Sequence, residues 1–465
     1  MSAPILWIAL PLIAGALILF LLDEKQSPYV GGGISALLAL VALFVPIDTA
    51  LLLGSLSVKI SPAVQVFGRS FELNAADGPL LALIYGLAAF WFFAAEASGS
   101  AHRFVSLGLM IIALLTASIA VEPFLYAALL LEMAAMLVVP LLVPLNVKPG
   151  RGVARFIIYQ TLAMPFILFS GWMLAGVEAS PGDLSATIQS GVMLSLGFAF
   201  LFAVFPLYNW IPQLMEETPP YATGFLLWAL PVFTVIFSLG FLDRYTWLRN
   251  SPQISQAMLV SGVIMTASGG IFAALQRHLG RILGYAAIAE TGIFLLALGI
   301  ETGDFVNVVF LALIPRGLEL SVWALALSIL NRETDSLRFS DVHGLARKYP
   351  MATAALFIAH LSTAGFPLLA GFPSRLALLY ELAPQSLASS FWVFIGLVGL
   401  LAAAIRALAA LVMAGEGTAW KTNESWVQIA MLGIGIIGLF LIGLFPQSMQ
   451  PFLSSLPALF GHLQP

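Results

Sequence analysis

Seven ionisable side chains lie deep in apolar stretches of this sequence or just past the end of one. They are Glu132, Glu290, Arg316, Glu319, His360, Arg375 and Arg406. A charge near the centre of a membrane helix costs about 2.5–3.5 kcal/mol on insertion scales, so such residues are rare and usually functional. Histidine titrates near neutral pH and carboxyl groups transfer protons, whereas arginine stays protonated and sets the local potential. The set predicts a proton path.

Structural ion pairs inside a helix bundle are the alternative explanation of these charges. Arg316 and Glu319 are three residues apart on one helix face, so they are able to pair with each other. We expect the loop charges Glu216 and Glu217, and those of residues 332–348, to be solvated and without chemistry of their own.

Two copies of one proline motif interrupt the apolar sequence. "FPLYNWIP" (205–212) contains Pro206 and Pro212, and "FPLLAGFP" (366–373) contains Pro367 and Pro373. Proline removes a backbone donor and clashes with the preceding turn of a helix. Freed carbonyls at membrane depth are tolerated only beside protein or a water-filled cavity. Matching breaks in two repeats are typical of a transport site at the membrane midplane.

The composition is that of a membrane protein. Of 465 residues, 60% are hydrophobic and 9% are charged, against ~25% charged in soluble domains. Nineteen basic residues against 23 acidic ones argue against a nucleic-acid partner. Cysteine is absent, which excludes disulfides and cysteine-ligated iron–sulfur clusters, and five scattered histidines make a metal site improbable. We therefore expect no cofactor and no metal in this chain.

A span needs ~20 mostly apolar residues, and the sequence contains about fourteen such stretches. They are 4–22, 29–46, 77–97, 104–121, 123–143, 153–176, 188–208, 219–241, 255–276, 281–300, 304–330, 350–372, 388–414 and 426–445. The predicted fold is an all-α polytopic membrane protein with about 14 transmembrane helices. Residues 47–76, with alternating Val, Ile and Phe, predict an extramembrane hairpin.

A long-range repeat relates the two halves. Glu132 in the fifth stretch and Glu290 in the tenth are 158 residues apart, close to the 161 residues that separate the proline motifs. Helices 4–8 and 9–13 are thus predicted to be two five-helix repeats, each with one broken helix. The odd number of spans per repeat inverts one copy relative to the other. The predicted domains are residues 1–103 (helices 1–3 with the hairpin), 104–250, 251–414 and 415–465 (helix 14 and the tail).

The orientation follows from the distribution of basic residues. Loops after odd-numbered stretches carry twelve Lys or Arg residues, and loops after even-numbered stretches carry four, with Arg375 just past the second motif. Cytoplasmic loops are enriched in Lys and Arg. We expect both termini on the outer side of a bacterial cytoplasmic (inner) membrane.

Several segments resemble one known family. "FPLYNWIPQLMEETPPYATGFL", "GRILGYAAIAETGIFLLAL", "STAGFPLLAGFPSRLALL", "IPRGLELSVWALA" and "LLLEMAAM" are similar to motifs of the antiporter-like membrane subunits of respiratory complex I (NADH:quinone oxidoreductase). Relatives of that family occur in Mrp-type antiporters and membrane-bound hydrogenases. The resemblance implies a proton-translocating subunit, coupled to electron transfer in other subunits and carrying no redox cofactor. Its partners would be other membrane subunits, lipid, and protons or Na⁺.

The chain also departs from the family pattern. Leu201 and Val232 occupy positions where the family has lysines, Glu290 replaces a histidine, and Arg316 replaces a lysine. We therefore expect the proton path to depend chiefly on the C-terminal half. Two alternatives remain open: a non-conducting scaffold subunit, or a subunit of an Mrp-type cation/proton antiporter or an inorganic-carbon uptake system.

The predicted orientation has a direct test. Single cysteines introduced at positions 2 and 340 should react with impermeant maleimide from opposite sides of the membrane, because the chain has no cysteine of its own. Labelling of both positions from the same side would contradict the topology.

Overall fold

The computed structural model of the chain describes residues 2–53, 56–143, 148–179, 184–300, 305–334, 336–413 and 420–463. Within these residues, eleven helices are long and apolar enough to cross a membrane, and three shorter apolar helices accompany them. The chain is therefore an integral membrane protein, and the predicted all-α class is confirmed. Each of the fourteen predicted stretches overlaps one of these helices, with ends that differ by a few residues.

Helices follow one another through nearly the whole chain. The N-terminal ones are a π-helical turn (Ile5–Ala9), α1 (Leu10–Leu21), α2 (Ser27–Phe44), α3 (Gly78–Phe93), α4 (Ala95–Ser98) and α5 (Ala101–Ala120). The middle ones are α6 (Ala127–Leu142), α7 (Arg151–Ala179), α8 (Leu184–Leu201), α9 (Trp210–Glu217), α10 (Pro220–Arg244) and α11 (Thr246–Arg249). The last ones are α12 (Pro252–Leu275), α13 (Leu279–Gly299), α14 (Phe305–Asn331), α15 (Leu345–Lys348), α16 (Pro350–Thr363), α17 (Phe372–Gln385), α18 (Leu387–Val412), α19 (Trp426–Leu444) and α20 (Gln450–Leu453).

The connection between α2 and α3 contains short strands. β1 (Ala50–Leu53) and β2 (Leu56–Lys59) form one antiparallel pair. β3 (Ala63–Val66) and β4 (Arg69–Glu72) form a second pair, and β5 (Val121–Glu122) joins it with Phe71 opposite Val121. The segment predicted as one hairpin is thus two hairpins, and the second is extended by the end of α5.

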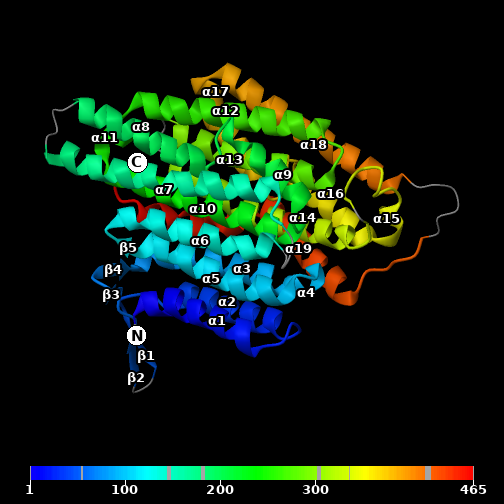
Figure 1. The fold of residues 1–465 in the computed structure, drawn as a ribbon, viewed down its shortest axis with the longest axis horizontal. Helices are drawn as coiled ribbons and strands as arrows, with labels where there is room; N and C mark the ends of the chain where they lie inside the picture. Colours follow the sequence, from blue (N-terminus) through cyan, green and yellow to red (C-terminus); the bar gives the residue numbers. More distant parts are fainter. Residues whose placement is uncertain are drawn as a thin grey trace.

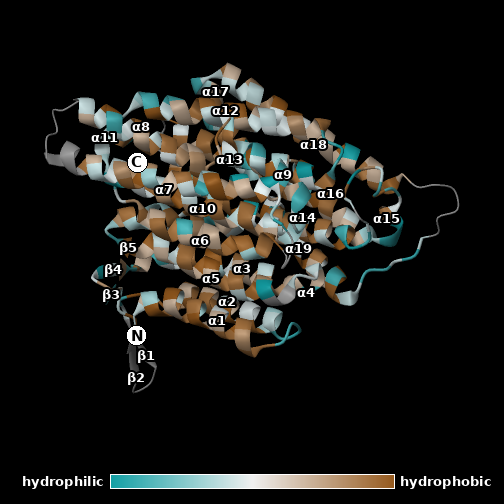
Figure 2. Ribbon diagram, in the orientation of Figure 1, coloured by the Kyte–Doolittle hydropathy of each residue, from teal (hydrophilic) through white to brown (hydrophobic). Residues whose placement is uncertain are grey.

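The long helices run side by side across the molecule (Figure 1). α1 and α2 lie at one edge, α12, α17 and α18 lie at the opposite edge, and α10, α13 and α14 lie between them. The strands and both chain ends lie at one end of the bundle, and α4 and α15 lie at the other. Figure 2 shows hydrophobic residues along the helices and hydrophilic residues gathered near α4 and α15.

The centre of the molecule is built from helices that are buried on all sides. α10, α13 and α14 carry apolar residues on all sides, with a few buried polar or charged side chains among them, and nearly all of their side chains are buried. This pattern is expected for a helix enclosed by other membrane helices. The peripheral helices α1, α2 and α19 instead leave many apolar side chains exposed, as a lipid-facing surface requires.

Both proline motifs lie where a helix is interrupted. α8 ends at Leu201 and α9 begins at Trp210, whereas α16 ends at Thr363 and α17 begins at Phe372, so the two segments without α-helix have the same length. The first contains a 3-10 turn at Leu207–Asn209. Pro206 and Pro367 lie within these segments, and Pro212 and Pro373 lie in the first turns of α9 and α17. The helices thus end a few residues before the apolar stretches do.

The two breaks begin with the same backbone motif. In the first, the amides of Ala203 and Val204 bond to the carbonyls of Phe200 and Ala199. In the second, those of Gly365 and Phe366 bond to Ser362 and Leu361. This is the Schellman pattern, which requires a left-handed residue, and φ is +50° at Ala203 and +77° at Gly365. The inverted five-helix arrangement itself stays a prediction.

The predicted domain boundaries fall at different kinds of position. The boundary between residues 103 and 104 lies in the first turn of α5, and the boundary between 250 and 251 separates α11 from α12. The boundary between 414 and 415 lies outside the described residues.

Glycine contacts allow α12 and α18 to pack closely. A Cβ atom added to Gly270 would clash with the backbone of Gly396, whereas one added to Gly33 in α2 would meet no atom within 4 Å. Gly270→Ala should therefore lower stability by about 1–3 kcal/mol through overpacking. Gly33→Ala should be neutral or slightly stabilising. The measurement is the thermal aggregation temperature of the detergent-purified protein, and equal values for the two variants would contradict the packing.

Candidate functional site

Four buried charges meet between α13, α14 and α17. Glu290, Arg316, Glu319 and Arg375 are each at most 2% exposed. Their formal charges cancel, because two are carboxylates and two are guanidinium groups. Unpaired buried charges are strongly unfavourable, so they must be paired and hydrogen-bonded to remain in such a place.

Arg316 is held by a carbonyl that a proline has freed. α10 contains Pro231, which lacks the N–H that would bond to the carbonyl of Leu227. Arg316 Nη2 donates to that carbonyl at 2.8 Å and to Thr291 Oγ1 at 3.2 Å. The proline thus provides a buried acceptor for the guanidinium group.

Glu290 contacts both arginines. Its carboxylate forms an ion pair with Arg375 Nη2, and its Oε2 lies 4.0 Å from Arg316 Nη1. Each of these three residues comes from a different helix, namely α13, α14 or α17. Glu290 therefore links two helices through charge, and it is the centre of the network.

Arg375 reaches the network because α16 is interrupted. Its Nη2 donates to the carbonyl of Thr363, the last residue of α16, at 3.1 Å, where the helix end favours a cation. Its Nη1 donates to Ser374 Oγ at 2.8 Å. A Cβ atom at Gly365 would lie 2.9 Å from Arg375 Cγ, so the glycine also makes room for the arginine.

Glu319 lies on the other side of Arg375. Its Oε2 is 3.8 Å from Arg375 Nη2, and its Oε1 accepts a hydrogen bond from Ser362 Oγ at 2.6 Å. The hydroxyl of Ser362 in turn accepts from the amide of Gly371 at 3.0 Å. The anticipated pairing of Arg316 with Glu319 is replaced by ion pairs to other helices. Arg316 extends toward α10 and α13, while Glu319 faces the break between α16 and α17.

His360 is buried near this network without an ion pair among the described residues. Its ring stacks on Trp323, with centroids 4.2 Å apart and planes inclined by 28°. The backbone of Leu400 faces it. His360 lies one turn before Thr363 on α16, so it belongs to the same helix end that receives Arg375.

Glu132 and Arg406 lie apart from the four-residue network. Glu132 is half-buried on α6, and its Oε1 accepts from Thr161 Oγ1 at 2.7 Å. Arg406 is half-buried on α18, and its guanidinium lies 5.7 Å from the ring centroid of Phe339. Both therefore have local partners, and neither forms an ion pair with another described residue.

Leu201 and Val232 are apolar residues at the two positions where the resemblance leads one to expect lysines. Val232 is 1% exposed on α10, and Leu201 is half-buried at the end of α8. The basic residue Arg155 donates instead to Gln213 Oε1 on α9 at 2.9 Å. The first break thus carries neutral side chains where the second carries the charged network.

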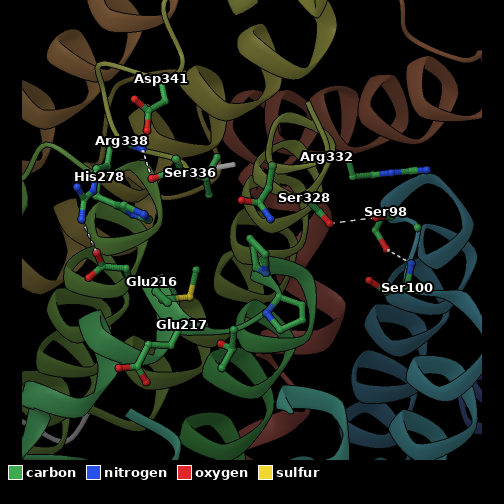
Figure 3. A pocket seen from close by; sticks show the side chains of 17 residues that line it. Ser98, Ser100, Glu216, Glu217, His278, Ser328, Arg332, Ser336, Arg338 and Asp341 are labelled. Atoms are coloured by element: carbon green, nitrogen blue, oxygen red, sulfur yellow. Dashed lines mark hydrogen bonds and ion pairs between the residues drawn. The ribbon is translucent and has the colours of Figure 1, made fainter. Parts of the chain in front are cut away.

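A polar cavity at the α4–α15 end was missed in the sequence reading. It has a volume of about 610 Å³ and is lined by loop and helix-end residues, among them Glu216, Glu217, His278, Arg332 and Arg338. In Figure 3, Glu216, His278 and Arg338 lie on one side of it, and Ser98, Ser100 and Arg332 lie on the other. We call this cavity the vestibule.

Ion pairs hold one wall of the vestibule. Glu216 pairs with Arg281 and lies 3.8 Å from Arg338. His278 caps the N-terminus of α13, where its side chain accepts from the amide of Arg281. Burial lowers the pKa of His278, and the carboxylate of Glu216 acts in the opposite direction. The loop charges expected to be merely solvated are thus organised around a cavity. The sequence signal that could have indicated this cavity was the concentration of charge in residues 332–348, together with Glu216 and Glu217 shortly after the first proline motif.

Within the part of the chain that the structure describes, no three His, Asp or Glu side chains are grouped so that they could hold a metal ion. The four buried charges pair with one another and bond to hydroxyl and carbonyl groups, and some of their N and O atoms, such as Arg316 Nε and Arg375 Nε, have no hydrogen-bond partner among the described residues.

Comparison with known proteins gives the family of the central segment. Residues 182–405 match the family described as "NADH:quinone oxidoreductase/Mrp antiporter, TM". The NADH-quinone oxidoreductase subunit N of Acidithiobacillus ferrooxidans is 27% identical over 235 residues, which are 50% of this chain and 47% of that protein. The chain spans about half the length of the curated relatives that it matches.

Solved structures extend the similarity to the whole chain. A chain of respiratory complex I from Thermus thermophilus has a TM-score of 0.81 at 20% identity, covering 99% of this chain and all of that one. A chain of the Mrp complex from Dietzia sp. has a TM-score of 0.79 at 16% identity, covering 99% of this chain and 52% of that one. Residues 182–405 are therefore a membrane domain of the NADH:quinone oxidoreductase/Mrp antiporter family, and the chain as a whole has the fold of an antiporter-like complex I subunit.

Proposed function

We propose that this chain is a proton-translocating, antiporter-like subunit of a multisubunit membrane redox complex of the complex I type. Electron transfer takes place in other subunits, and this chain conducts protons without a redox cofactor of its own. The observation that carries the proposal is the network of Glu290, Arg316, Glu319 and Arg375 at the second broken helix.

The sharing of Arg375 gives the network two arrangements. Its Nη2 is paired with Glu290 and lies 3.8 Å from Glu319. A proton bound by Glu290 removes the negative charge that holds Arg375, so the guanidinium group shifts toward Glu319. Release of the proton reverses the shift. Arginine stays charged throughout, and the carboxylates carry the proton.

The first half has a supporting part in this proposal. Glu132 bonds only to the hydroxyl of Thr161 among the described residues, and Met133 and Met136 beside it on α6 are exposed. A half-exposed carboxyl group facing lipid is unfavourable. We infer that a neighbouring membrane subunit covers α6 and supplies a polar partner to Glu132. The complex would lie in a bacterial cytoplasmic membrane with both termini of this chain outside.

A scaffold role is the second candidate. Its support is the charge balance of the network, since two permanent cations matched by two carboxylates also form a static ion cluster. Leu201 and Val232 add to it, because they are apolar at two positions where the resemblance leads one to expect lysines. A charge-balanced double variant separates the two candidates.

Glu290→Gln alone should impair assembly, because it leaves Arg316 and Arg375 with a single carboxylate. Removing one partner of a buried pair costs about 3–5 kcal/mol. Glu290→Gln combined with Arg375→Gln keeps the network neutral, so it should assemble in near-normal amounts. If the network conducts, the double variant should translocate fewer protons per electron in the reconstituted complex.

Glu132→Gln is the matched control for this experiment, since it also replaces a membrane carboxyl group but lies outside the network. We expect it to reduce translocation less than the double variant does. Normal proton stoichiometry in the assembled double variant would show that the network is structural, and the scaffold role would then hold.

If a neighbouring subunit packs against α6 and supplies a partner to Glu132, the isolated chain should be inactive. Reconstituted alone in liposomes, it should show no robust proton uptake beyond that of empty vesicles, measured with an entrapped pH dye. Glu132 would then lack its partner subunit, and no coupled electron transfer would drive the network. Sustained uptake by the isolated chain at rates comparable to those of the complex would contradict this prediction.

A further inference from the structure

A small internal cavity lies where the first broken helix meets the charged network. Its volume is about 20 Å³, and residues of α7, α8, α9, α10 and α13 line it. A water molecule needs roughly 10–15 Å³ of such space and two to four polar partners. The cavity therefore has room for one water molecule.

Polar groups of the lining include one donor without a partner. Trp210, at the start of α9, is 3% exposed, and its indole Nε1 has no hydrogen-bond partner among the described residues. A buried N–H group left unpaired is unfavourable. Gln160 of α7, 6% exposed, also lines the cavity and contributes an amide.

Thr291 offers an acceptor on the opposite wall. Its hydroxyl donates to the carbonyl of Ala287 at 2.9 Å and accepts from Arg316 Nη2 at 3.2 Å. A hydroxyl oxygen has two lone pairs, so one remains. Leu227 also lines the cavity, and its carbonyl accepts the other hydrogen bond of Arg316 Nη2. Two groups on this wall thus contact the guanidinium group directly.

We propose that this cavity binds one water molecule, which accepts a hydrogen bond from the Trp210 indole and donates one to Thr291. The water then connects the first broken helix to Arg316 by hydrogen bonds. Trp210 is a positioning residue in this arrangement, because it acts through the water. The part of the inference that concerns proton movement rests on the proposed function, whereas the water site itself does not.

The helices around the water site also reach the vestibule. α9 and α10 line both the vestibule and this cavity, with Met215 and Pro220 at the first and Ile211 and Leu227 at the second. α13 lines the cavity with Ala287, and the residue that caps it, His278, lines the vestibule. Thr218 lines the vestibule, and its hydroxyl lies 2.5 Å from that of Thr223, which is one turn into α10. From the vestibule to the cavity, polar groups thus occur at the vestibule wall, at the hydroxyl pair and at the proposed water site.

Apolar side chains limit the site to a single molecule. Leu201, Phe202, Leu226 and Leu230 form much of the wall. Gly284 of α13 packs against α9 so closely that an added Cβ atom would lie 3.1 Å from Pro212 Cα. The space around the cavity is therefore tightly packed. A water molecule bound in the cavity depends on the few polar groups that line it.

The test compares two tryptophans in the full chain within the assembled complex. Trp210→Phe removes the proposed donor. Trp91→Phe is the matched control, since Trp91 is also fully buried with an unpartnered indole but lies in the aromatic cluster of α3, α5 and α10. Ultraviolet resonance Raman difference spectra, wild type minus variant, report the hydrogen bonding of each indole N–H.

We expect the difference spectrum for Trp210 to show a hydrogen-bonded indole and that for Trp91 a free one. In Thr291→Val, which keeps Trp210, the indole signal should shift toward the free position. Loss of one hydrogen bond weakens the affinity for water by up to about tenfold. A free indole at Trp210 in the wild-type complex, or no shift in Thr291→Val, would overturn the water site.

The number of protons translocated per electron tests whether the water takes part in proton movement. It should fall in Trp210→Phe and stay unchanged in Trp91→Phe, at equal amounts of assembled complex. Normal translocation in Trp210→Phe, where the double variant of Glu290 and Arg375 abolishes it, would overturn this role of the water and leave the proposed function intact. Normal translocation in the double variant would overturn the proposed function, and with it the conducting role of the water.

Discussion

The position of Arg375 at the end of α16 is the constraint on which the second half of the molecule depends. A guanidinium group in this place must satisfy five donors and one charge inside the membrane. The Thr363 carbonyl and Ser374 hydroxyl accept two of its hydrogen bonds, and Glu290 and Glu319 provide the charge. In a helix that continued past Thr363, the partner of its carbonyl would be Pro367, which has no N–H group. The proline motif thus leaves this carbonyl free to accept from Arg375.

The first break has the same Schellman backbone motif as the second, but it carries no buried charge among the described residues. Ala203 and Gly365 occupy equivalent left-handed positions, and the same offset of 162 residues relates Gln213 to Arg375. Gln213 accepts from Arg155 and meets no carboxylate among the described residues. Alanine in the left-handed region costs about 1–2 kcal/mol, which glycine avoids. This conformation persists at the first break although no charged side chain uses it. The break therefore has a role other than receiving an arginine, and the water site beside Trp210 provides one.

The sequence predicts the class of this protein and its breaks because both follow from local chemistry. Apolar length predicts membrane helices, and a repeated proline motif predicts two interruptions. What a residue meets on another helix depends on packing, and that part was beyond prediction. Arg316 and Glu319 share a helix face but pair with different helices, and Arg406 lies against Phe339 instead of the network. The acceptor that Pro231 frees for Arg316 was equally hidden, because α10 and α14 are far apart in sequence.

The eight residues of α9 connect the surface with the interior. Glu216 near its end is fixed by Arg281, and Glu217 accepts from the amide of Gly152 at 2.7 Å. Trp210 at its start lies about 9 Å away along the helix axis, at the internal cavity. A helix this short has little stability of its own, so its position is set by the contacts of its two ends and by the packing of its buried residues against α7 and α13. One short element therefore places Glu216 at the vestibule and Trp210 at the internal cavity. The first broken helix, which carries no charge at membrane depth, in this way joins a surface carboxylate to a buried indole.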